Sequence, residues 1–398
     1  MSRVSKKKLL ILSPSLAGGG FERVISLISL NAPRDVDVSI GIFKKIISYP
    51  VRSPVYLLGD YNNIFAAFKA YINLNKLIYR LKPDSLIFFG IGQGLGVSLL
   101  SISKNKFLSV RNYRFEPNKH LLYKKIYFKL LFALCTKILT KKIIVNSLPI
   151  KQKLLEEYRI RGNKVKVIYN PVDLKMIKEL ASMHIDINEA EVFKHPVIIN
   201  VGRMINQKGQ WHLIRAFKLV NEEIPNTRLV ILGEGKLRDY LVRLINELKL
   251  NDNMYLPGWK SNPFKYMARS TLFCLSSLWE GFPNVVVEAL ACGLPVMSTD
   301  CLSGPREILA PGTEYKVDRL KGPEYAEYGI LMPVFDGKRY TARDPLTWQE
   351  EMWAEEIVKL LKNPEILENY RQRAKRRAMD FEAKKQVQKY FDVIFNQS

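Results

Sequence analysis

A strand, a turn and a helix with sharply marked ends follow one another in the second half of the chain. The apolar run 272–275 predicts a buried strand, and the glycine and proline within residues 279–283 predict a tight turn after it. Residues 284–292 predict a helix, because Gly293 and Pro295 stand where a C-terminal glycine and a following proline end helices. A strand that leads through a turn into a helix is the repeating unit of parallel α/β sheets.

The same alternation runs through most of the 398 residues. In the first half, strands are predicted at 9–13, 36–43, 85–89 and 107–110, with helices at 21–30 and 64–81. In the second half, strands are predicted at 197–201, 228–232, 254–256 and 296–299, with helices at 210–223, 236–248, 348–361 and 364–389. The fold class is therefore α/β, with two Rossmann-like domains that are each built on a parallel sheet.

The chain is long enough for two domains, each with its own core. The cluster Asn170–Asp173 predicts the end of the first domain, and the polar stretch 175–194 is predicted to cross to the second. We expect the first domain to span residues 1–180 and the second residues 190–380. The C-terminal helix, about residues 381–398, is expected to pack back on the first domain.

Positive charge is concentrated in the first half of the chain. Residues 1–195 hold 33 Lys and Arg against 13 Asp and Glu, whereas residues 196–398 hold 29 against 25. Such asymmetry indicates a polyanionic partner, either nucleic acid or an anionic membrane surface. Every long apolar run is interrupted before about 18 residues, so no transmembrane helix is predicted. The four cysteines and four histidines have no metal-ligand spacing, and no metal site is expected.

Residues 104–142 form the most basic segment, with eleven Lys and Arg and one acid, Glu116. Apolar residues recur among these cations at helical spacing, which is the composition of a basic amphipathic helix on anionic lipid. The alternative is an ordinary domain helix with one core face and one solvated basic face. Because no nucleic-acid readout motif accompanies the charge, we expect a membrane partner and no nucleic acid.

Two carboxylates flank the start of the predicted helix 284–292. Glu280 lies in the turn before it, and Glu288 lies within it. The first turn of a helix offers unpaired N–H groups and the positive end of the helix dipole, which together bind phosphate. Carboxylates beside a phosphate site suit a ligand that has both hydroxyl and phosphate groups, such as a nucleotide sugar. The alternative is a pair of solvated or capping acids.

Two cations follow the predicted strand 197–201. Arg203 and Lys208 come directly after its carboxyl end, where open α/β sheets bind ligands. A guanidinium offers a two-pronged contact to phosphate and an ammonium offers a point charge. Together they can stabilise the negative charge that develops on a leaving diphosphate without a metal ion. A surface charge pair is the alternative.

A glycine loop, Gly18, Gly19 and Gly20, separates the first predicted strand from its helix. Such a loop lets backbone approach a phosphate, although the spacing is not that of a dinucleotide fingerprint and a plain tight turn is the alternative.

Together, these pieces resemble a known family. The ordered set consists of Gly202-Arg203 with Gln207-Lys208-Gly209, Leu232-Gly233-Glu234-Gly235, Gly258-Trp259, Glu280-Gly281-Phe282-Pro283 and Glu288. In this order they resemble the retaining glycosyltransferases of family four, which have the GT-B fold of two Rossmann-like domains facing across a cleft. Residues 303–308 further resemble bacterial members that transfer hexose or N-acetylhexosamine during glycan assembly on a polyprenyl carrier.

The resemblance implies roles for the site residues. Arg203 and Lys208 would bind the diphosphate beside Gly202, Glu288 would hold the ribose hydroxyls, and Glu280 would lie near the transferred sugar. Backbone groups of Phe282, Pro283, Asn284 and Val285 would complete the phosphate site, and the loop of Gly18, Gly19 and Gly20 would meet the diphosphate from the first domain. Gly258 and Trp259 match the loop where the base lies, although a packing aromatic in a turn is an alternative role for Trp259.

One position departs from the family pattern. Many relatives have a histidine near the transferred sugar, beyond the fourth strand of the first domain, but here the neighbourhood reads Ser109-Val110-Arg111-Asn112. Arg111 would supply a positive partner to the sugar or the acceptor phosphate instead, or it is a plain surface cation.

The expected activity is retaining transfer of a hexose or N-acetylhexosamine from a nucleotide sugar, UDP-linked, to a polyprenyl-diphosphate-linked glycan. No cofactor or metal is expected, and the protein is expected to be cytoplasmic, at the inner face of the cell membrane. A sugar-nucleotide 2-epimerase of the same fold is one alternative, and a basic nucleic-acid-binding protein is another.

Overall fold

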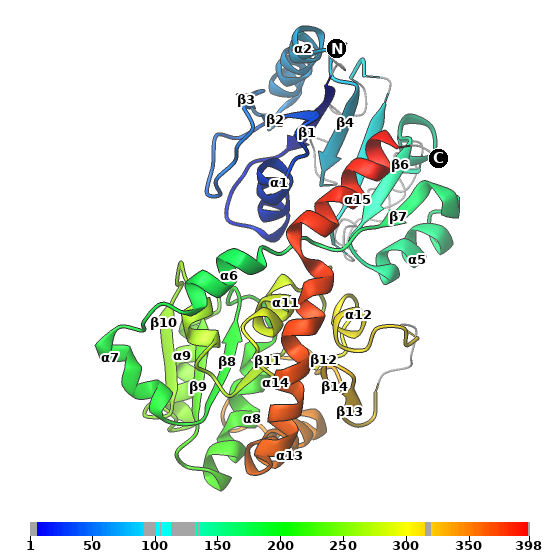
Figure 1. The fold of residues 1–398 in the computed structure, drawn as a ribbon. Coiled ribbons are helices and arrows are strands. Elements are labelled where there is room, and N and C mark those ends of the chain that lie inside the picture. The colour runs from blue at the N-terminus through cyan, green and yellow to red at the C-terminus, as the bar shows by residue number, and fades with distance from the viewer. Residues whose placement is uncertain are drawn as a thin grey trace. The chain divides into compact units, whose positions relative to one another are not determined.

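The computed structural model describes residues 6–90, 101–103, 105–112, 132–133, 135–314 and 320–396. The chain divides into two compact units (Figure 1). Unit 1 contains Met1–Val172 together with Glu382–Ser398, and unit 2 contains Asp173–Phe381. Unit 2 is therefore inserted between two parts of unit 1.

The described part of unit 1 is built on a seven-stranded sheet in which every neighbouring pair is parallel. The strand order is β3-β2-β1-β4-β5-β6-β7. Its strands are β1 (Lys7–Ser13), β2 (Val36–Ile42), β3 (Val55–Leu57), β4 (Ser85–Phe89), β5 (Lys106–Val110), β6 (Lys142–Val145) and β7 (Val165–Val167). The α/β class with a parallel sheet is confirmed for this unit.

Helices cover both faces of this sheet. Alternate side chains of β1 divide between two cores, because successive residues of a strand point to opposite faces. Leu9 and Ile11 pack with α1 (Gly20–Leu30) and α15 (Ala383–Phe395), and Leu10 and Leu12 pack with α2 (Ile64–Leu81) and α5 (Leu148–Glu156). The unit also contains a short π-helix, η1 (Cys135–Leu139), and a 3-10 turn, η2 (Gly162–Lys164).

Helix α15 brings the end of the chain back to unit 1. Val387, Tyr390, Phe391 and Ile394 of α15 are buried in the same core as the β1 residues Leu9 and Ile11. An isolated parallel bridge joins Val172 to Glu382, so the chain leaves and re-enters unit 1 at adjacent points. This helix follows unit 2 in the chain, and it completes the core of the first unit.

Unit 2 contains a second seven-stranded sheet within the described residues, in the order β10-β9-β8-β11-β12-β14-β13. All neighbours are parallel except β13 and β14. Its strands are β8 (Val197–Val201), β9 (Arg228–Leu232), β10 (Met254–Gly258), β11 (Leu272–Leu275), β12 (Val296–Thr299), β13 (Glu324–Ala326) and β14 (Gly329–Met332). Two Rossmann-like sheets are thus present in one chain.

The helices of unit 2 surround this sheet (Figure 1). They are α6 (Leu174–Ala181), α7 (Ile187–Ala190), α8 (Gln210–Glu223), α9 (Arg238–Glu247), α10 (Phe264–Met267), α11 (Asn284–Ala291), α12 (Pro305–Leu309), α13 (Trp348–Lys362) and α14 (Pro364–Ala378). Shorter 3-10 turns are η3 (Glu191–Lys194), η4 (Asn206–Lys208) and η5 (Met379–Phe381). Trp211 of α8 and Trp353 of α13 are fully buried in the core on one face.

The boundary between the units differs from the one predicted at residue 180. Asp173 caps α6 by accepting a hydrogen bond from the Met176 amide (2.9 Å), and Ile177 of α6 is buried within unit 2. The Asn262 side chain and the Arg269 guanidinium also donate to carbonyls at the end of α6. Helix α6 is therefore the first helix of unit 2, because its capping hydrogen bonds and the burial of Ile177 are supplied by that unit.

The long helix predicted at 364–389 is also wrong, because it is two helices. Helix α14 ends at Ala378, and η5 turns the chain before α15 begins. Glu382 caps α15 with a side-chain oxygen that accepts from the Lys385 amide (3.0 Å). The basic pattern of the segment is continuous across this break, so periodicity alone did not reveal it.

Glu189 joins the chain that enters unit 2 to the rest of that unit. Its carboxylate accepts hydrogen bonds from Lys260 (2.6 Å), Tyr255 (2.7 Å) and Tyr266. Burial on its own would raise the pKa of Glu189, but the hydrogen bonds from Lys260, Tyr266 and Tyr255 outweigh burial and lower that pKa from 4.5 to about 2.

Because the folded-state pKa of Glu189 is depressed, its contribution to stability is present above about pH 4.5 and is lost as the pH falls toward 2. The free energy of unfolding of the wild type should therefore fall more steeply in this window than that of Glu189→Gln. All five tryptophans lie in unit 2, so their fluorescence follows its unfolding. Glu247→Gln, at an exposed carboxylate of α9, is the control and should follow the wild type. Parallel curves for Glu189→Gln and wild type would contradict the assignment.

Candidate functional site

The carboxyl ends of two neighbouring strands of unit 2 bring a buried ion pair together. Strand β8 leads into η4, which ends at Lys208, and β11 leads into the turn that holds Glu280. Lys208 Nζ lies 2.6 Å from Glu280 Oε1, and the two side chains are only 14% and 8% exposed. Two of the predicted site residues, 72 positions apart, are therefore in direct contact.

Further donors fix the Glu280 carboxylate. Ser277 Oγ donates to Oε1 at 2.7 Å, and Gln207 Nε2 donates to Oε2 at 3.2 Å. Gln207 Nε2 also donates to the Trp279 carbonyl at 2.9 Å. Both carboxylate oxygens thus accept hydrogen bonds from the protein. Gln207 and Ser277 were not predicted as site residues, although Gln207 belongs to the motif that contains Lys208.

The backbone holds these two segments against each other. The Leu278 amide donates to the Gln207 carbonyl (2.8 Å), and Ser276 Oγ donates to the Lys208 carbonyl (2.8 Å). On the other side, the Glu280 amide donates to the Leu302 carbonyl at 2.9 Å. The position of the ion pair is therefore set by main-chain contacts and not only by the charges themselves.

Glycines allow two loops to approach this edge closely. Gly235 packs so tightly on the loop after β8 that a Cβ there would lie 2.4 Å from the Met204 carbonyl oxygen. Gly304 has a φ of +102°, and a Cβ there would lie 2.6 Å from Pro283 Cδ at the start of α11. At both positions a larger residue would push away a loop that borders the site.

The start of α11 is the predicted phosphate site. Pro283 is its N-cap residue and makes no side-chain cap, so the first amides of the helix are not capped by that residue. Phe282 and Pro283 are buried, whereas Asn284 and Val285 are half-buried. Glu288, one turn into α11, is buried at 7% exposure.

Two other predicted residues of unit 2 are exposed. Arg203 follows β8, and its side chain makes no hydrogen bond or ion pair with the part of the chain that the structure describes. Trp259 follows Gly258 at the end of β10 and is 71% exposed, so it does not have the alternative role of a packing aromatic. Gly202 lies against Lys208, because a Cβ on it would lie 3.1 Å from Lys208 Cε.

The predicted glycine loop of unit 1 follows β1. Gly18 is exposed and has open space where a Cβ would stand, and Gly19 is the N-cap residue of α1. Helix α1 begins at Gly20 and has no side-chain cap at its N-cap residue. Gly18 and Gly20 thus leave exposed backbone at the carboxyl end of a central strand, whereas the buried carboxylate of Glu22 lies against Gly19.

Arg111 follows β5 and is not the surface cation that one prediction allowed. Its Nε donates to Ser109 Oγ (2.7 Å) and its Nη1 donates to Asn170 Oδ1. The guanidinium lies over the rings of Phe89 and Tyr390, with centroid distances of 5.1 and 5.5 Å. Burial lowers its pKa to about 9, and its Nη2 is buried without a hydrogen-bond partner among the described residues. It remains charged near neutral pH, without a carboxylate partner in the described part of the chain.

Much of the basic segment 104–142 lies outside the described residues, including 104, 113–131 and 134. The predicted amphipathic helix falls in this range. Over the described residues, no three His, Cys, Asp or Glu side chains are grouped so as to hold a metal ion. Among the helices that the structure describes, none is long and apolar enough to cross a membrane.

Comparison with known proteins places this geometry in a family. The family model described as "Glycosyl transferases group 1" matches residues 185–319. An uncharacterized glycosyltransferase of Methanocaldococcus jannaschii is 36% identical over 364 residues, which cover 87% of each chain. The chain belongs to the group 1 glycosyltransferases.

Two further similarities extend this result. One relative is the Campylobacter jejuni N-acetylgalactosamine-N,N'-diacetylbacillosaminyl-diphospho-undecaprenol 4-alpha-N-acetylgalactosaminyltransferase. The two sequences are 32% identical, over 60% of this chain and 56% of the relative. The crystal structure of Anabaena HepE in complex with UDP superposes with a TM-score of 0.74, at 17% identity, over 98% of this chain and 100% of that one. The family and the GT-B fold, both expected from the sequence, are confirmed.

The buried pair of the glycosyltransferase should be energetically coupled. Lys208→Met or Glu280→Gln leaves the partner charge buried and unpaired, so each should lower the free energy of unfolding of unit 2 by about 3 kcal/mol. The double variant should lose less than the sum, by roughly 1–3 kcal/mol. Chemical unfolding followed by tryptophan fluorescence measures all three.

The control for this cycle is the exposed pair of Lys218 and Glu222 on α8, whose charged atoms are 2.8 Å apart. The coupling of that pair should stay below about 0.5 kcal/mol, because solvent screens exposed charges. If the double variant loses as much free energy of unfolding as the two single variants together, the contact between Lys208 and Glu280 contributes no coupling energy.

Proposed function

We propose that this glycosyltransferase moves a hexose or an N-acetylhexosamine from a nucleotide sugar, UDP-linked, to a polyprenyl-diphosphate-linked glycan, with retention of anomeric configuration. The observation that carries the proposal is the buried contact of Lys208 with Glu280 at the carboxyl edge of the unit 2 sheet. Open α/β sheets bind their ligands at that edge. An ammonium held there is available to the diphosphate of a nucleotide sugar.

The leaving diphosphate would be stabilised without a metal ion or cofactor. Lys208 supplies a fixed point charge, and Arg203, exposed and unpaired among the described residues, supplies a guanidinium able to make a two-pronged contact. The first amides of α11, around residues 282–285, would add N–H donors and the positive end of the helix dipole. Glu288 would hold the ribose hydroxyls, and the loop at Gly258 and Trp259 would contact the base.

Glu280 is proposed to position Lys208 near the transferred sugar and not to act as a nucleophile. Its two oxygens already accept hydrogen bonds from Lys208, Ser277 and Gln207. These bonds hold the carboxylate in place and occupy the lone pairs that a nucleophile would need. In the proposed step, the bond from the anomeric carbon to the phosphate oxygen breaks and the acceptor hydroxyl oxygen bonds to that carbon on the same face. The acceptor proton passes to the leaving phosphate, and a nucleoside diphosphate is released.

Unit 1 is proposed to receive the acceptor. It holds 33 Lys and Arg against 10 Asp and Glu, a net charge of +23, whereas unit 2 holds 29 against 28. The Arg111 guanidinium, which has no carboxylate partner among the described residues, would attract the acceptor diphosphate, and the loop of Gly18, Gly19 and Gly20 would approach the donor diphosphate. An anionic lipid carrier suits such a domain better than a neutral free sugar.

The relatives support the same substrate classes. The name of the Campylobacter relative specifies a diphospho-undecaprenol acceptor. An Escherichia coli relative, 30% identical over 47% of this chain, is named for UDP-Gal and an α-D-GlcNAc-diphosphoundecaprenol. A cytoplasmic location at the inner face of the membrane, with residues 104–142 on anionic lipid, is proposed from these names and from the charge.

Removal of the donor-site charges should stop transfer. Lys208→Ala should lower kcat/KM by at least about a hundredfold, because a fixed positive charge aimed at a leaving group is worth that much. Glu288→Ala should lower it by about as much, because the hydrogen bonds from the ribose hydroxyls to a buried carboxylate are lost. Radiolabelled transfer to a lipid-linked acceptor measures the rate, and tryptophan fluorescence at the assay temperature checks that unit 2 is folded. Lys218→Ala, on the exposed face of α8, is the control and should keep wild-type activity. Near-normal turnover by either site variant would refute the site assignment.

The donor class should emerge from thermal unfolding with UDP-, GDP- and ADP-sugars. Only UDP-sugars are expected to raise the Tm of the wild type, since a ligand that binds the folded state stabilises it. The Glu288→Ala variant should lose this shift. The mechanism is tested with the donor that this screen identifies. NMR of the product should show the donor's anomeric configuration, and no covalent adduct should form on Glu280. An inverted product, or an adduct trapped with a slow donor, would overturn the mechanism. Conversion of the donor sugar without acceptor would indicate an epimerase.

A further inference from the structure

Helix α2 of unit 1 has two opposite apolar faces. Ala70, Leu74, Leu77 and Ile78 are buried against the sheet. On the other side, Phe65, Phe68 and Tyr79 are 84%, 64% and 77% exposed, and Ile72 is also exposed. Successive members of this outer set are three, four and seven residues apart, so they form one stripe along the helix. The stripe is far more apolar than the solvent-facing side of an ordinary domain helix.

A second segment extends the stripe. The Ile102 amide donates to the side-chain oxygen of Asn75 on α2 at 2.9 Å, and the Ile102 side chain is 59% exposed. Two stretches that are far apart in sequence therefore present large apolar side chains beside each other. A contiguous exposed apolar patch on a folded unit indicates a surface that binds a partner.

Positive charge lies beside this stripe. Lys69, Lys76 and Arg80 are exposed, and α2 contains no Asp or Glu. On a helical projection these three cations are next to the apolar stripe, on the side between it and the core face. An apolar stripe edged by cations, with no acid on the helix, is the composition of helices that lie in a membrane interface.

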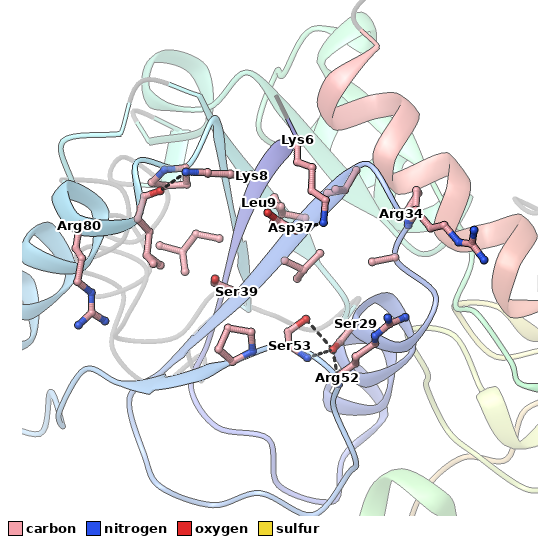
Figure 2. A pocket seen from close by; sticks show the side chains of 18 residues that line it. Lys6, Lys8, Leu9, Ser29, Arg34, Asp37, Ser39, Arg52, Ser53 and Arg80 are labelled. Carbon is pink, nitrogen blue, oxygen red and sulfur yellow. Dashed lines mark hydrogen bonds and ion pairs between the residues drawn. The ribbon is translucent and has the colours of Figure 1, made fainter. Parts of the chain in front are cut away.

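The charge continues past the end of α2. Arg80 and Leu81 line a cavity of about 770 Å³ at the amino-terminal edge of the sheet. It is bordered by five cations, Lys6, Lys8, Arg34, Arg52 and Arg80, and by one acid, Asp37, which Lys6 pairs with at 3.1 Å. Figure 2 shows these cations spaced around the cavity and not gathered at one point. Spaced cations suit several phosphate headgroups better than one small anion.

We propose that the outer face of α2, with the basic cavity at its end, rests on an anionic phospholipid bilayer. Phe65, Phe68 and Ile72 would enter the boundary between headgroups and acyl chains, and the flanking cations would meet lipid phosphates. A second copy of the chain is a poor occupant, because each unit 1 carries a net charge of +23 and two such faces repel. A nucleic acid would leave the apolar stripe in water.

This inference deepens the proposed function and rests on it for its purpose, since a lipid-linked acceptor requires the enzyme at a membrane. It concerns residues other than those of the segment 104–142. A docked α2 would hold unit 1 against the bilayer that contains the acceptor.

The test is flotation with vesicles of phosphatidylcholine alone or mixed with phosphatidylglycerol. Wild-type protein should bind the anionic vesicles and not the neutral ones. Phe65→Ser with Phe68→Ser should weaken binding by at least about tenfold, because two large apolar side chains no longer leave water. Lys69→Gln with Lys76→Gln should weaken it by about fivefold for each charge, which corresponds to about 1 kcal/mol per cation.

Matched controls separate docking from misfolding and from catalysis. Ile187→Ser with Met379→Ser removes exposed apolar side chains from unit 2, which are 91% and 63% exposed, and should bind vesicles as wild type does. The α2 variants should keep the circular dichroism, the Tm and the activity of wild type on a short-chain acceptor in detergent. If wild-type protein binds anionic vesicles as expected but has no transfer activity on that acceptor, the result would count against the proposed function and leave the docking surface standing.

Three results would overturn the inference. The first is full binding by the α2 variants when Lys124→Gln, Lys125→Gln and Lys129→Gln together abolish it, which would place the membrane contact in 104–142. The second is equal capture by neutral and anionic vesicles. The third is a dimer by light scattering that the Phe65→Ser and Phe68→Ser changes make monomeric, which would make this face an interface between copies.

Discussion

The contact between Lys208 and Glu280 is the constraint on which the site of unit 2 depends. Burying either charge alone would carry a large desolvation penalty, and the attraction between the two charges offsets that penalty. The pair joins the loop after β8 to the turn after β11, and the same turn leads into α11. The orientation of that helix start, and with it the direction of its first amides, is therefore coupled to this ion pair together with the main-chain contacts that hold the same two segments. A change at Glu280 therefore bears on the charge at the site and on the turn that leads into α11.

The family and the architecture could be predicted because they depend on local patterns. Five predicted strands run directly into a glycine or a proline: 9–13, 85–89, 197–201, 228–232 and 254–256. The order of the motifs along the chain is specific even though each motif is weak alone. The boundaries were harder. The polar stretch 175–194 was predicted to be a linker, yet its first residues belong to α6, a helix of unit 2 with a capped start and one buried side chain, Ile177. The break between α14 and α15 is set by packing on two different units, which a helical period does not record.

The contacts within the sites could not be predicted, because they join residues that are far apart in the sequence. Lys208 and Glu280 are separated by 72 residues, and Arg111 meets Tyr390 from the other end of the chain. The sequence indicates that such residues follow strand ends, but only the sheet order decides which ends are neighbours. Similarly, apolar residues occur on both sides of α2, and only the packing of Leu74 and Leu77 on the sheet reveals that Phe65 and Phe68 are outside. The roles assigned to the donor-site residues stay predictions.

The return of α15 to unit 1 has a consequence for how the protein is made. Phe89, Phe107 and Ile144 lie in the core that α15 closes with Tyr390 and Phe391, and those residues leave the ribosome long before the helix does. The whole of unit 2 must be synthesised in between. During that time the first unit exposes part of its core, while the inserted unit has all of its own strands and can fold at once. Unit 1 therefore begins to be synthesised before unit 2 but is completed after it, and the basic, aromatic-rich first unit depends on protection until α15 has been made.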